Sequence, residues 1–375
     1  MRIRSLVLVP LLLLAAPSSA QRAAITINTA TPEGRLLEQI RQESDDAKKV
    51  ALAEQFVGQY PDNPAVSWAY SQMVDSCTKT GQFDKALDAA GKVLARDPAD
   101  IPTAYAAVKA AEAKKDPDAV RKWAVEASGL ARKTAQAAKT ADEDDDAFQA
   151  RVASAKNLAT YTEYALYAAA TQTQDPQKRV DLFKALEEQS PESTYLIQGY
   201  GLYFLALKQC VDLSAAVALA ERLIPKNQAT EEMVATAGEY YLRQNKEPQK
   251  VIDYSAKLIA IVNARPRPDG VSDADWQKYK THYLGWGQWM TGVVYCSQSK
   301  FADANKVLRE ALPLLEDNDE YKAAALFNLG IANVHLKNMA DSARFFEQCV
   351  AMKSPYQQVC SDNLKSIRST YRVVK

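Results

Sequence analysis

The sequence predicts an all-α protein, an α-solenoid in which antiparallel helix pairs follow one another along the chain. Apolar residues recur three and four positions apart over most of its length, which is the period of an amphipathic helix. Glycine is scarce, with 13 among 375 residues, so few tight β-hairpin turns are expected. A third observation, a spacing that returns along the chain, indicates that the helices come in repeats.

The returning spacing places four residues 4, 3 and 5 positions apart, and the last of the four is a proline. Each copy predicts a helix in which the first three of the four residues pack against a neighbouring helix. The helix then ends before the proline, because proline cannot continue a helix. The three copies are Ala86, Ala90, Val93 and Pro98; Arg179, Phe183, Leu186 and Pro191; and Leu213, Val217, Ala220 and Pro225.

Residues 1–20 have the features of a secretory signal peptide. Arg2 and Arg4 precede an apolar run at 6–16, and Ser18 and Ala20 are small residues two apart, as a signal peptidase requires. We expect cleavage after Ala20. The run of about 11 residues is short for a membrane anchor, which needs roughly 20.

Residues 21–32 carry no helical period and are expected to form a flexible leader. Residues 33–262 are expected to hold N-terminal helical repeats, interrupted at 129–146, where the pattern is lost. The acid run at 142–146 invites a calcium interpretation, but it lacks the glycine and the terminal glutamate of a calcium loop. We expect instead a solvated loop whose acids cap a helix that begins near Ala147.

The next break is expected at 263–274, a hinge loop that contains Pro266, Pro268 and Gly270. Residues 275–375 are expected to form C-terminal repeats with a capping helix over roughly 356–371. Between the two breaks, the apolar period predicts helices at 147–172, 176–189, 193–208, 212–224, 229–244 and 247–262.

Several stretches carry the side chains of a two-helix repeat at matching places. In the clearest one, Gly81 suits a helix C-terminus, Phe83 fills the space between helices, and Ala86 is small where two helices approach closely. In these residues the chain resembles the tetratricopeptide (TPR) family, whose repeat has about 34 residues. The resemblance covers nearly the whole mature chain and implies a right-handed superhelix that binds peptides on its inner face. Two further copies are Gly292, Tyr295, Ala304, Leu308 and Ala311, and Leu329, Gly330, Ser342, Phe346 and Cys349.

Charge and cysteine usage narrow the partner and the compartment. Lys and Arg number 46 and Asp and Glu also 46, so no basic excess favours nucleic acid. Export would permit disulfides. An odd number of widely spaced cysteines without CxxC favours buried thiols, whereas the close pair Cys349 and Cys360 leaves a bond between them open. The five cysteines are Cys77, Cys210, Cys296, Cys349 and Cys360.

No motif for catalysis, a metal or a cofactor is present in the sequence. His282 and His335 are the two histidines, and neither belongs to an HExxH or zinc-type cluster. GxSxG, P-loop and GxGxxG motifs are also missing. We therefore expect a non-enzymatic protein without cofactor; an enzyme would need convergent polar groups around one of these histidines.

The TPR resemblance implies that positions 2, 5, 9, 12 and 13 of the first helix in each pair line the inner face. Aromatic residues at positions 2 and 5 would give a large contact area at low entropic cost. A register shift of one or two would place them in the interhelical core, and both alternatives stay open. The groove candidates are Trp68, Tyr105, Tyr161, Tyr164, Tyr195, Trp286, Trp289 and Phe327. Some TPR domains grip a C-terminal carboxylate with lysine and asparagine side chains at fixed positions of the first helix, and that pattern is absent here. Position 9 holds Asp75, Lys109, Ala168, Leu202, Val293 and Ile331.

Together these features predict an exported scaffold of bacterial type, periplasmic or extracellular and soluble once the signal peptide is removed. Its partner would be a protein or a peptide segment bound in the groove. A carbohydrate-binding helical-repeat protein is the alternative, because exposed Trp and Tyr also stack on sugar rings.

Overall fold

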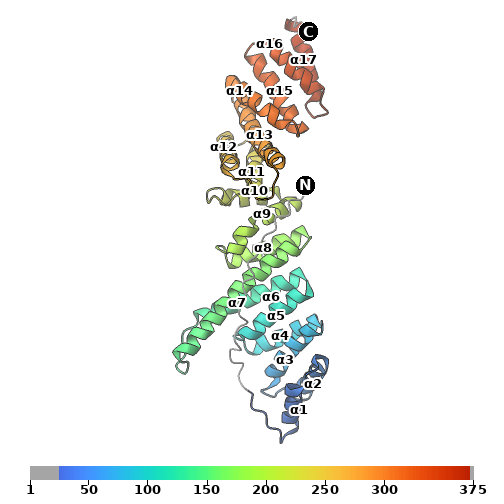
Figure 1. Ribbon diagram of the computed structural model, residues 1–375, viewed down its shortest axis with the longest axis vertical. Helices are drawn as coiled ribbons and strands as arrows, with labels where there is room; N and C mark the ends of the chain where they lie inside the picture. Colours follow the sequence, from blue (N-terminus) through green and yellow to red (C-terminus); the bar gives the residue numbers. More distant parts are fainter. Residues whose placement is uncertain (1–24, 372–375) are drawn as a thin grey trace. The chain divides into compact units, whose positions relative to one another are not determined.

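The computed structural model describes residues 25–371, which form 17 α-helices and one short 3-10 helix and contain no strand (Figure 1). Consecutive helices pack on one another from α1 to α8 and from α10 to α17. The predicted all-α helical repeat is confirmed. The predicted signal peptide, residues 1–20, lies outside the described residues.

The chain divides into two compact units, one up to Ala206 and one from Leu207. The division falls inside a helix, α9 (Thr194–Gln209), whereas the sequence led us to expect a break at 263–274. The loop there joins α12 (Pro248–Ala264) to α13 (Asp273–Ser297), and these two helices pack on each other within the second unit. Proline and glycine therefore mark a turn at this place, while the unit boundary depends on packing.

The first unit stacks its helices in two layers, the first and the second member of each pair. Its odd-numbered helices contact one another, α3 with α5 and α5 with α7, and α6 contacts α8. The helices are α1 (Pro32–Gln42), α2 (Asp46–Gln59), α3 (Val66–Lys79), α4 (Phe83–Arg96), α5 (Ile101–Lys114), α6 (Pro117–Gln136), α7 (Asp145–Gln172) and α8 (Pro176–Gln189).

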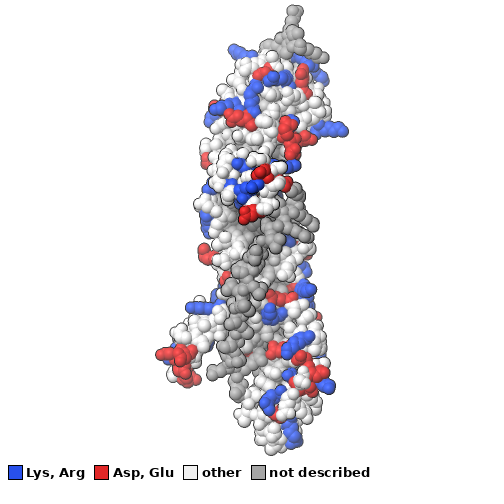
Figure 2. All heavy atoms as spheres, viewed as in Figure 1, with Lys and Arg blue, Asp and Glu red and all other residues white. Residues whose placement is uncertain are grey.

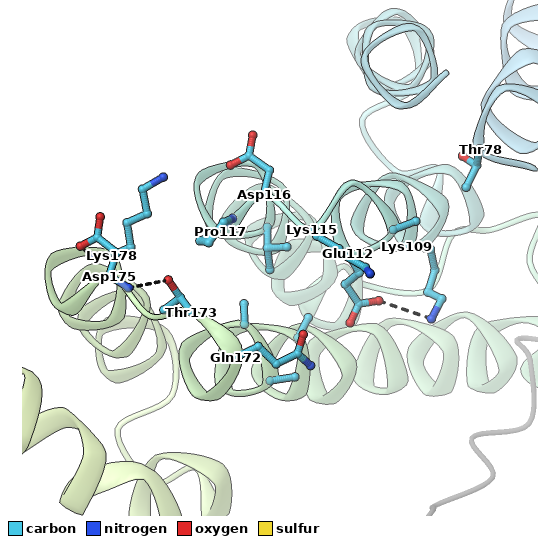
Figure 3. Close-up of a pocket in the computed structure, with 15 residues that line it drawn as sticks. Thr78, Lys109, Glu112, Lys115, Asp116, Pro117, Gln172, Thr173, Asp175 and Lys178 are labelled. Atoms are coloured by element: carbon cyan, nitrogen blue, oxygen red, sulfur yellow. Dashed lines mark hydrogen bonds and ion pairs between the residues drawn. The ribbon is translucent and has the colours of Figure 1, made fainter. Parts of the chain in front are cut away.

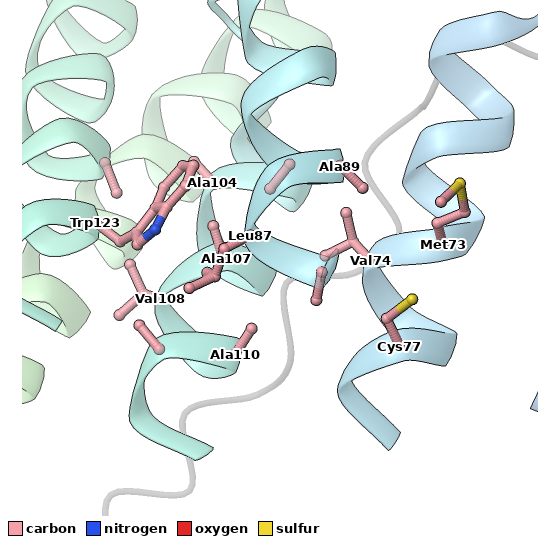
Figure 4. Packing of buried hydrophobic residues seen from close by; sticks show 14 of the residues in the cluster. Met73, Val74, Cys77, Leu87, Ala89, Ala104, Ala107, Val108, Ala110 and Trp123 are labelled. Carbon is pink, nitrogen blue, oxygen red and sulfur yellow. The ribbon is translucent and has the colours of Figure 1, made fainter. Parts of the chain in front are cut away.

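Small and β-branched side chains let these helices approach closely, as Figure 4 shows around Ala107 and Val108 of α5 and Trp123 of α6. Ala86, Ala90 and Val93 of the first repeated spacing are all buried in this core. Ile25 and Ile27, in the segment predicted to be a flexible leader, also pack against it.

A long helical hairpin, α6 and α7, projects from the first unit (Figure 1). Its tip carries the acid run, seen in red in Figure 2. Asp144 is the N-cap of α7, because its carboxylate accepts a hydrogen bond from the amide of Ala147 at 2.7 Å. Arg151 binds Glu143 and the carbonyl of Thr134, which ties the tip together. The expected capping role of the acids is confirmed.

In the second unit, glycines admit large side chains from the partner helix of each pair. A Cβ on Gly330 would collide with the ring of Phe346, and one on Gly292 would collide with Leu308. These are the spacings that the repeat motifs predict. The helices of this unit are α10 (Leu213–Leu223), α11 (Glu231–Arg243), α12, α13, α14 (Phe301–Ala311), η1 (Leu312–Leu315), α15 (Asp319–His335), α16 (Met339–Val350) and α17 (Gln357–Tyr371).

Cys349 and Cys360 form a disulfide that joins α16 to α17, which resolves the alternative left open by the sequence. The other three cysteines are free, with Cys77 buried and Cys210 and Cys296 half-buried. No helix within 25–371 has the length and apolar character needed to cross a membrane.

Candidate functional site

A cavity of about 810 Å³ opens in the first unit among α3, α5 and α7 (Figure 3). Its lining combines charged and polar groups with small apolar ones. The lining residues are Thr78, Lys109, Glu112, Ala113, Lys115, Asp116, Pro117, Val120, Ala165, Ala168, Ala169, Gln172, Thr173, Asp175 and Lys178.

Part of this lining comes from the positions that the TPR resemblance assigns to the inner face. Counted in the register used above, Lys109 and Ala168 are at position 9, Thr78 and Glu112 at position 12, and Gln172 at position 13. Three successive first helices therefore present matching positions to one cavity.

Alanines give the cavity its room. Ala165, Ala168 and Ala169 of α7 and Ala113 of α5 all line it, where larger side chains would fill the space. Alanine also has the highest helix propensity, so α7 stays a continuous helix of 28 residues while its small side chains leave space beside it. The result is a concave, partly apolar site within the size range of ligand-binding clefts.

A row of tyrosines continues from the cavity along the first unit. The ring of Tyr161 lies 4.8 Å from that of Tyr105 and 6.2 Å from that of Tyr164, and Tyr164 lies 5.8 Å from Tyr195. All four are groove candidates from the sequence. Tyr161 is buried and the other three are half-buried, so the row is set into the surface with its outer rings accessible.

Tyr161 connects this row to the cavity. Its hydroxyl donates a hydrogen bond to the carboxylate of Glu112, and the Nζ atom of Lys109 lies 5.4 Å from its ring centroid. Burial, and then the carboxylate beside it, raises the pKa of Tyr161 well above its usual range. Tyr161 is therefore a neutral donor that fixes Glu112 at the edge of the cavity.

The acidic residues of the cavity already serve the structure. Asp116 caps α6 by accepting from the amide of Asp118 at 3.1 Å, and Asp175 caps α8 by accepting from that of Gln177 at 2.9 Å. Burial acts to raise the pKa of Asp116, but the ion pair with Lys114 and the helix amides outweigh it and lower that pKa. The carboxylate of Asp116 therefore stays ionised at neutral pH.

The structure buries the tryptophan candidates of the second unit. Trp286 and Trp289 are only 7% and 6% exposed, and both pack on Tyr321 of α15, whose ring lies 4.4 Å from that of Trp289. Their indole nitrogens are buried without a hydrogen-bond partner among the described residues. This burial fits the interhelical-core alternative for these two residues.

The two remaining candidates are half-buried and have other neighbours. Trp68 packs against the core of the first unit, and Phe327 contacts Phe346 and Tyr356 in the second. The eight candidates thus separate into four tyrosines that form one surface row, two buried tryptophans, and two residues at other places.

Neither histidine lies in the cavity. His282 packs on Trp286 and Tyr283, and His335 stacks on Phe301 at 4.0 Å between ring centroids. Within 25–371 no group of three or more His, Cys, Asp or Glu residues could hold a metal ion.

Sequence reasoning missed four of the six charged residues of the cavity lining. Lys109 was identified as a position-9 residue, and the register also assigns Glu112 to position 12. Lys115, Asp116, Asp175 and Lys178 lie outside the register, because they are in a turn, cap a second helix or begin one.

Comparison with known proteins adds little to this picture. No family model matches the chain, and no curated protein matches it significantly. The TPR domain of P58(IPK) aligns with 90% of this chain and 98% of its own, at 13% identity and a TM-score of 0.29. The APC/C hetero-tetramer Cut9-Hcn1 aligns at 13% identity and a TM-score of 0.35, covering 91% of this chain and 57% of that one. These scores are too low to support more than the helix packing shows by itself, namely a helical repeat.

Proposed function

We propose that the protein is a non-catalytic scaffold that binds a segment of another protein in the first unit. The observation that carries the proposal is the cavity, because inner-face positions of α3, α5 and α7 meet there and the row of four tyrosines continues from it. A preformed groove of packed helices orders little on binding, so most of the interaction free energy is available for affinity.

The place of action in this proposal is outside the cytoplasm. Residues 1–20 have the composition of a cleavable signal peptide, and the disulfide between Cys349 and Cys360 is a bond that persists in oxidising compartments. We therefore propose a soluble periplasmic or extracellular scaffold of a bacterial cell envelope.

A peptide fits the groove better than a sugar does. Beyond Tyr195, α9 presents the apolar side chains of Ile197, Leu202 and Leu205 to solvent, which are 41%, 36% and 44% exposed. Sugar sites pair stacked aromatics with free polar groups, whereas the acids here are engaged in caps and ion pairs. The exposed apolar residues favour the side chains of a protein segment.

A cavity-filling substitution tests this function. A peptide is first selected from a phage-displayed random library on the wild-type chain, and its affinity is then measured by fluorescence anisotropy. Ala168→Phe fills the cavity from its α7 side and should reduce affinity at least tenfold with an unchanged Tm, a loss of about 1.4 kcal/mol. Ala150→Phe is the matched control on the same helix, at an exposed site outside the cavity. Equal affinity of the two variants would refute binding at this site.

A further inference from the structure

We propose that the segment bound by the first unit is acidic and apolar, with carboxylates facing Lys109, Lys115 and Lys178 and apolar side chains facing α9. The inference rests on the proposed function and specifies the chemistry of its partner. It follows from a comparison of the charged side chains of the cavity: the acids are held by contacts within the protein, and the lysines are held less.

By count the cavity is neutral, because three lysines and three acids line it. The acids, however, are committed to other contacts. Glu112 accepts from the hydroxyl of Tyr161 and pairs with Lys109, while Asp116 and Asp175 each accept from backbone amides at the start of a helix. An incoming cation would have to compete with these contacts.

The lysines are less committed. Lys115 forms no ion pair within the described residues and is exposed. Lys109 is 49% exposed and its Nζ atom lies 3.3 Å from Glu112, a carboxylate that it shares with Tyr161. Lys178 pairs at 3.2 Å only with Asp118, whose side chain is itself 55% exposed. Exposed pairs of this kind contribute little and exchange readily, so a carboxylate from a partner can recruit all three lysines.

These lysines also come from separate elements, which makes them a site rather than one charged helix face. Lys109 lies on α5, Lys115 in the turn that follows, and Lys178 in the first turn of α8, and Figure 3 shows Lys109 and Lys178 at opposite ends of the cavity. A segment that crosses the cavity therefore meets positive charge along its path.

The apolar half of the inference comes from α9. Leu202 and Leu205 occupy positions 9 and 12 of this helix, the positions that Lys109 and Glu112 occupy on α5. Both leucines are exposed. They lie on the same helix as Tyr195, the last tyrosine of the row that begins at the cavity. Carboxylates over α5 and α8 followed by apolar residues over α9 would match both halves of the groove.

The test uses three fluorescein-labelled peptides of one design and the full-length secreted chain. The first carries a stretch of Glu followed by a stretch of Leu and Phe, the second carries Lys in place of every Glu, and the third carries Gln there. We expect the Glu peptide to bind at least tenfold more tightly than the other two, and its affinity to fall as salt is raised. The triple variant Lys109→Gln, Lys115→Gln and Lys178→Gln should lose roughly tenfold for the Glu peptide only, the combined effect of three partly exposed pairs.

The matched control replaces Lys133, Lys156 and Lys184 by Gln, since these are exposed lysines of the same unit outside the cavity. It changes net charge equally and should leave affinity unchanged. Equal losses of affinity in the two triple variants would overturn the inference. Tighter binding of the Lys or the Gln peptide would also overturn it. If Ala168→Phe abolished that binding, the proposed groove function would stand. If no peptide, including one selected from the library, responds to Ala168→Phe, both proposals fail together.

Discussion

The aromatic residues of this protein differ in how deeply they are buried. Tyr105, Tyr164 and Tyr195 keep part of their rings at the surface of the first unit, while Trp286 and Trp289 are enclosed between α13 and α15. Aromatic side chains at corresponding helix positions thus stay partly exposed in one place and fill a core in another. The distinction depends on the neighbours that pack over them.

Truncation of the two tryptophans should therefore cost stability. Trp286→Ala or Trp289→Ala removes a large buried side chain, and each is expected to lower the free energy of unfolding by about 3–5 kcal/mol. Chemical denaturation measures the loss. The conservative variant Trp289→Phe keeps a ring against Tyr321 and should lose less; a Tm unchanged in both alanine variants would show that the side chains are not in the core.

Gly330 is a second position where one atom decides the packing. A Cβ there would collide with the buried ring of Phe346, so Gly330→Ala should destabilise by about 1–3 kcal/mol. Gly129, in α6, has open space around it, and Gly129→Ala should gain up to about 1 kcal/mol from helix propensity. Thermal unfolding of the two variants should shift in opposite directions, and shifts of the same sign would contradict this account.

At the scale of elements, the terminal helix shows how the repeat ends. α17 packs on α16 and buries Cys360, Leu364 and Ile367 against it, and the disulfide fastens it covalently. A helix array must cover its last apolar face, and α17 does so for the second unit.

Removing this bond should loosen the C-terminal end. Cys349→Ser with Cys360→Ser is expected to lower stability by about 2–4 kcal/mol, because the unfolded chain regains the freedom that the cross-link removed. A reducing agent should reproduce the shift in the wild type and have no effect on the variant. A wild type that melts identically with and without reductant would argue against a bond that supports α17.

Another element-level feature is the tyrosine and carboxylate network of α10, α11 and α12. Tyr241 and Tyr254 both donate to Glu221, which also pairs with Lys250. Burial, followed by the hydrogen bond to Glu221, raises the pKa of Tyr254 to about 12. The unfolded chain would release this proton near pH 10, so the contribution to stability is complete below about pH 10 and is lost as the pH rises towards 12.

We accordingly expect the Tm to fall between about pH 10 and pH 12, with part of the fall absent in Tyr254→Phe. Other half-buried tyrosines, such as Tyr283, have raised pKa values and act in the same direction. Differential scanning calorimetry across this range checks the sign, and a Tm that rises with pH would contradict it.

Over the whole chain, local sequence signals predict the bounds of some helices but do not predict how distant helices pack. α8 was expected at 176–189 and is found at Pro176–Gln189, because an aspartate cap, a proline at the helix start and a proline beyond its end are all local signals. The division inside α9 and the course of α6 to Gln136 were not anticipated. Both depend on how distant helices pack, which the spacing of apolar residues does not contain.

The site divides in the same way. The inner-face register anticipated the tyrosine row, since it needs only the phase of each first helix. It could not supply Lys115, Asp116 and Lys178, which reach the cavity from turns and second helices. The burial of Trp286 depends on contacts with α15, far away in the chain, and the phase of α13 is the same for a groove and for a core.

The most direct test of the central claim is hydrogen–deuterium exchange of the full chain with and without a peptide selected on it. If the first unit binds the segment in its cavity and along its tyrosine row, protection should appear in the backbone around Tyr105–Asp116 and around Tyr161–Lys178. The second unit should exchange as before. Protection confined to the second unit, or to the α6–α7 tip, would contradict the account.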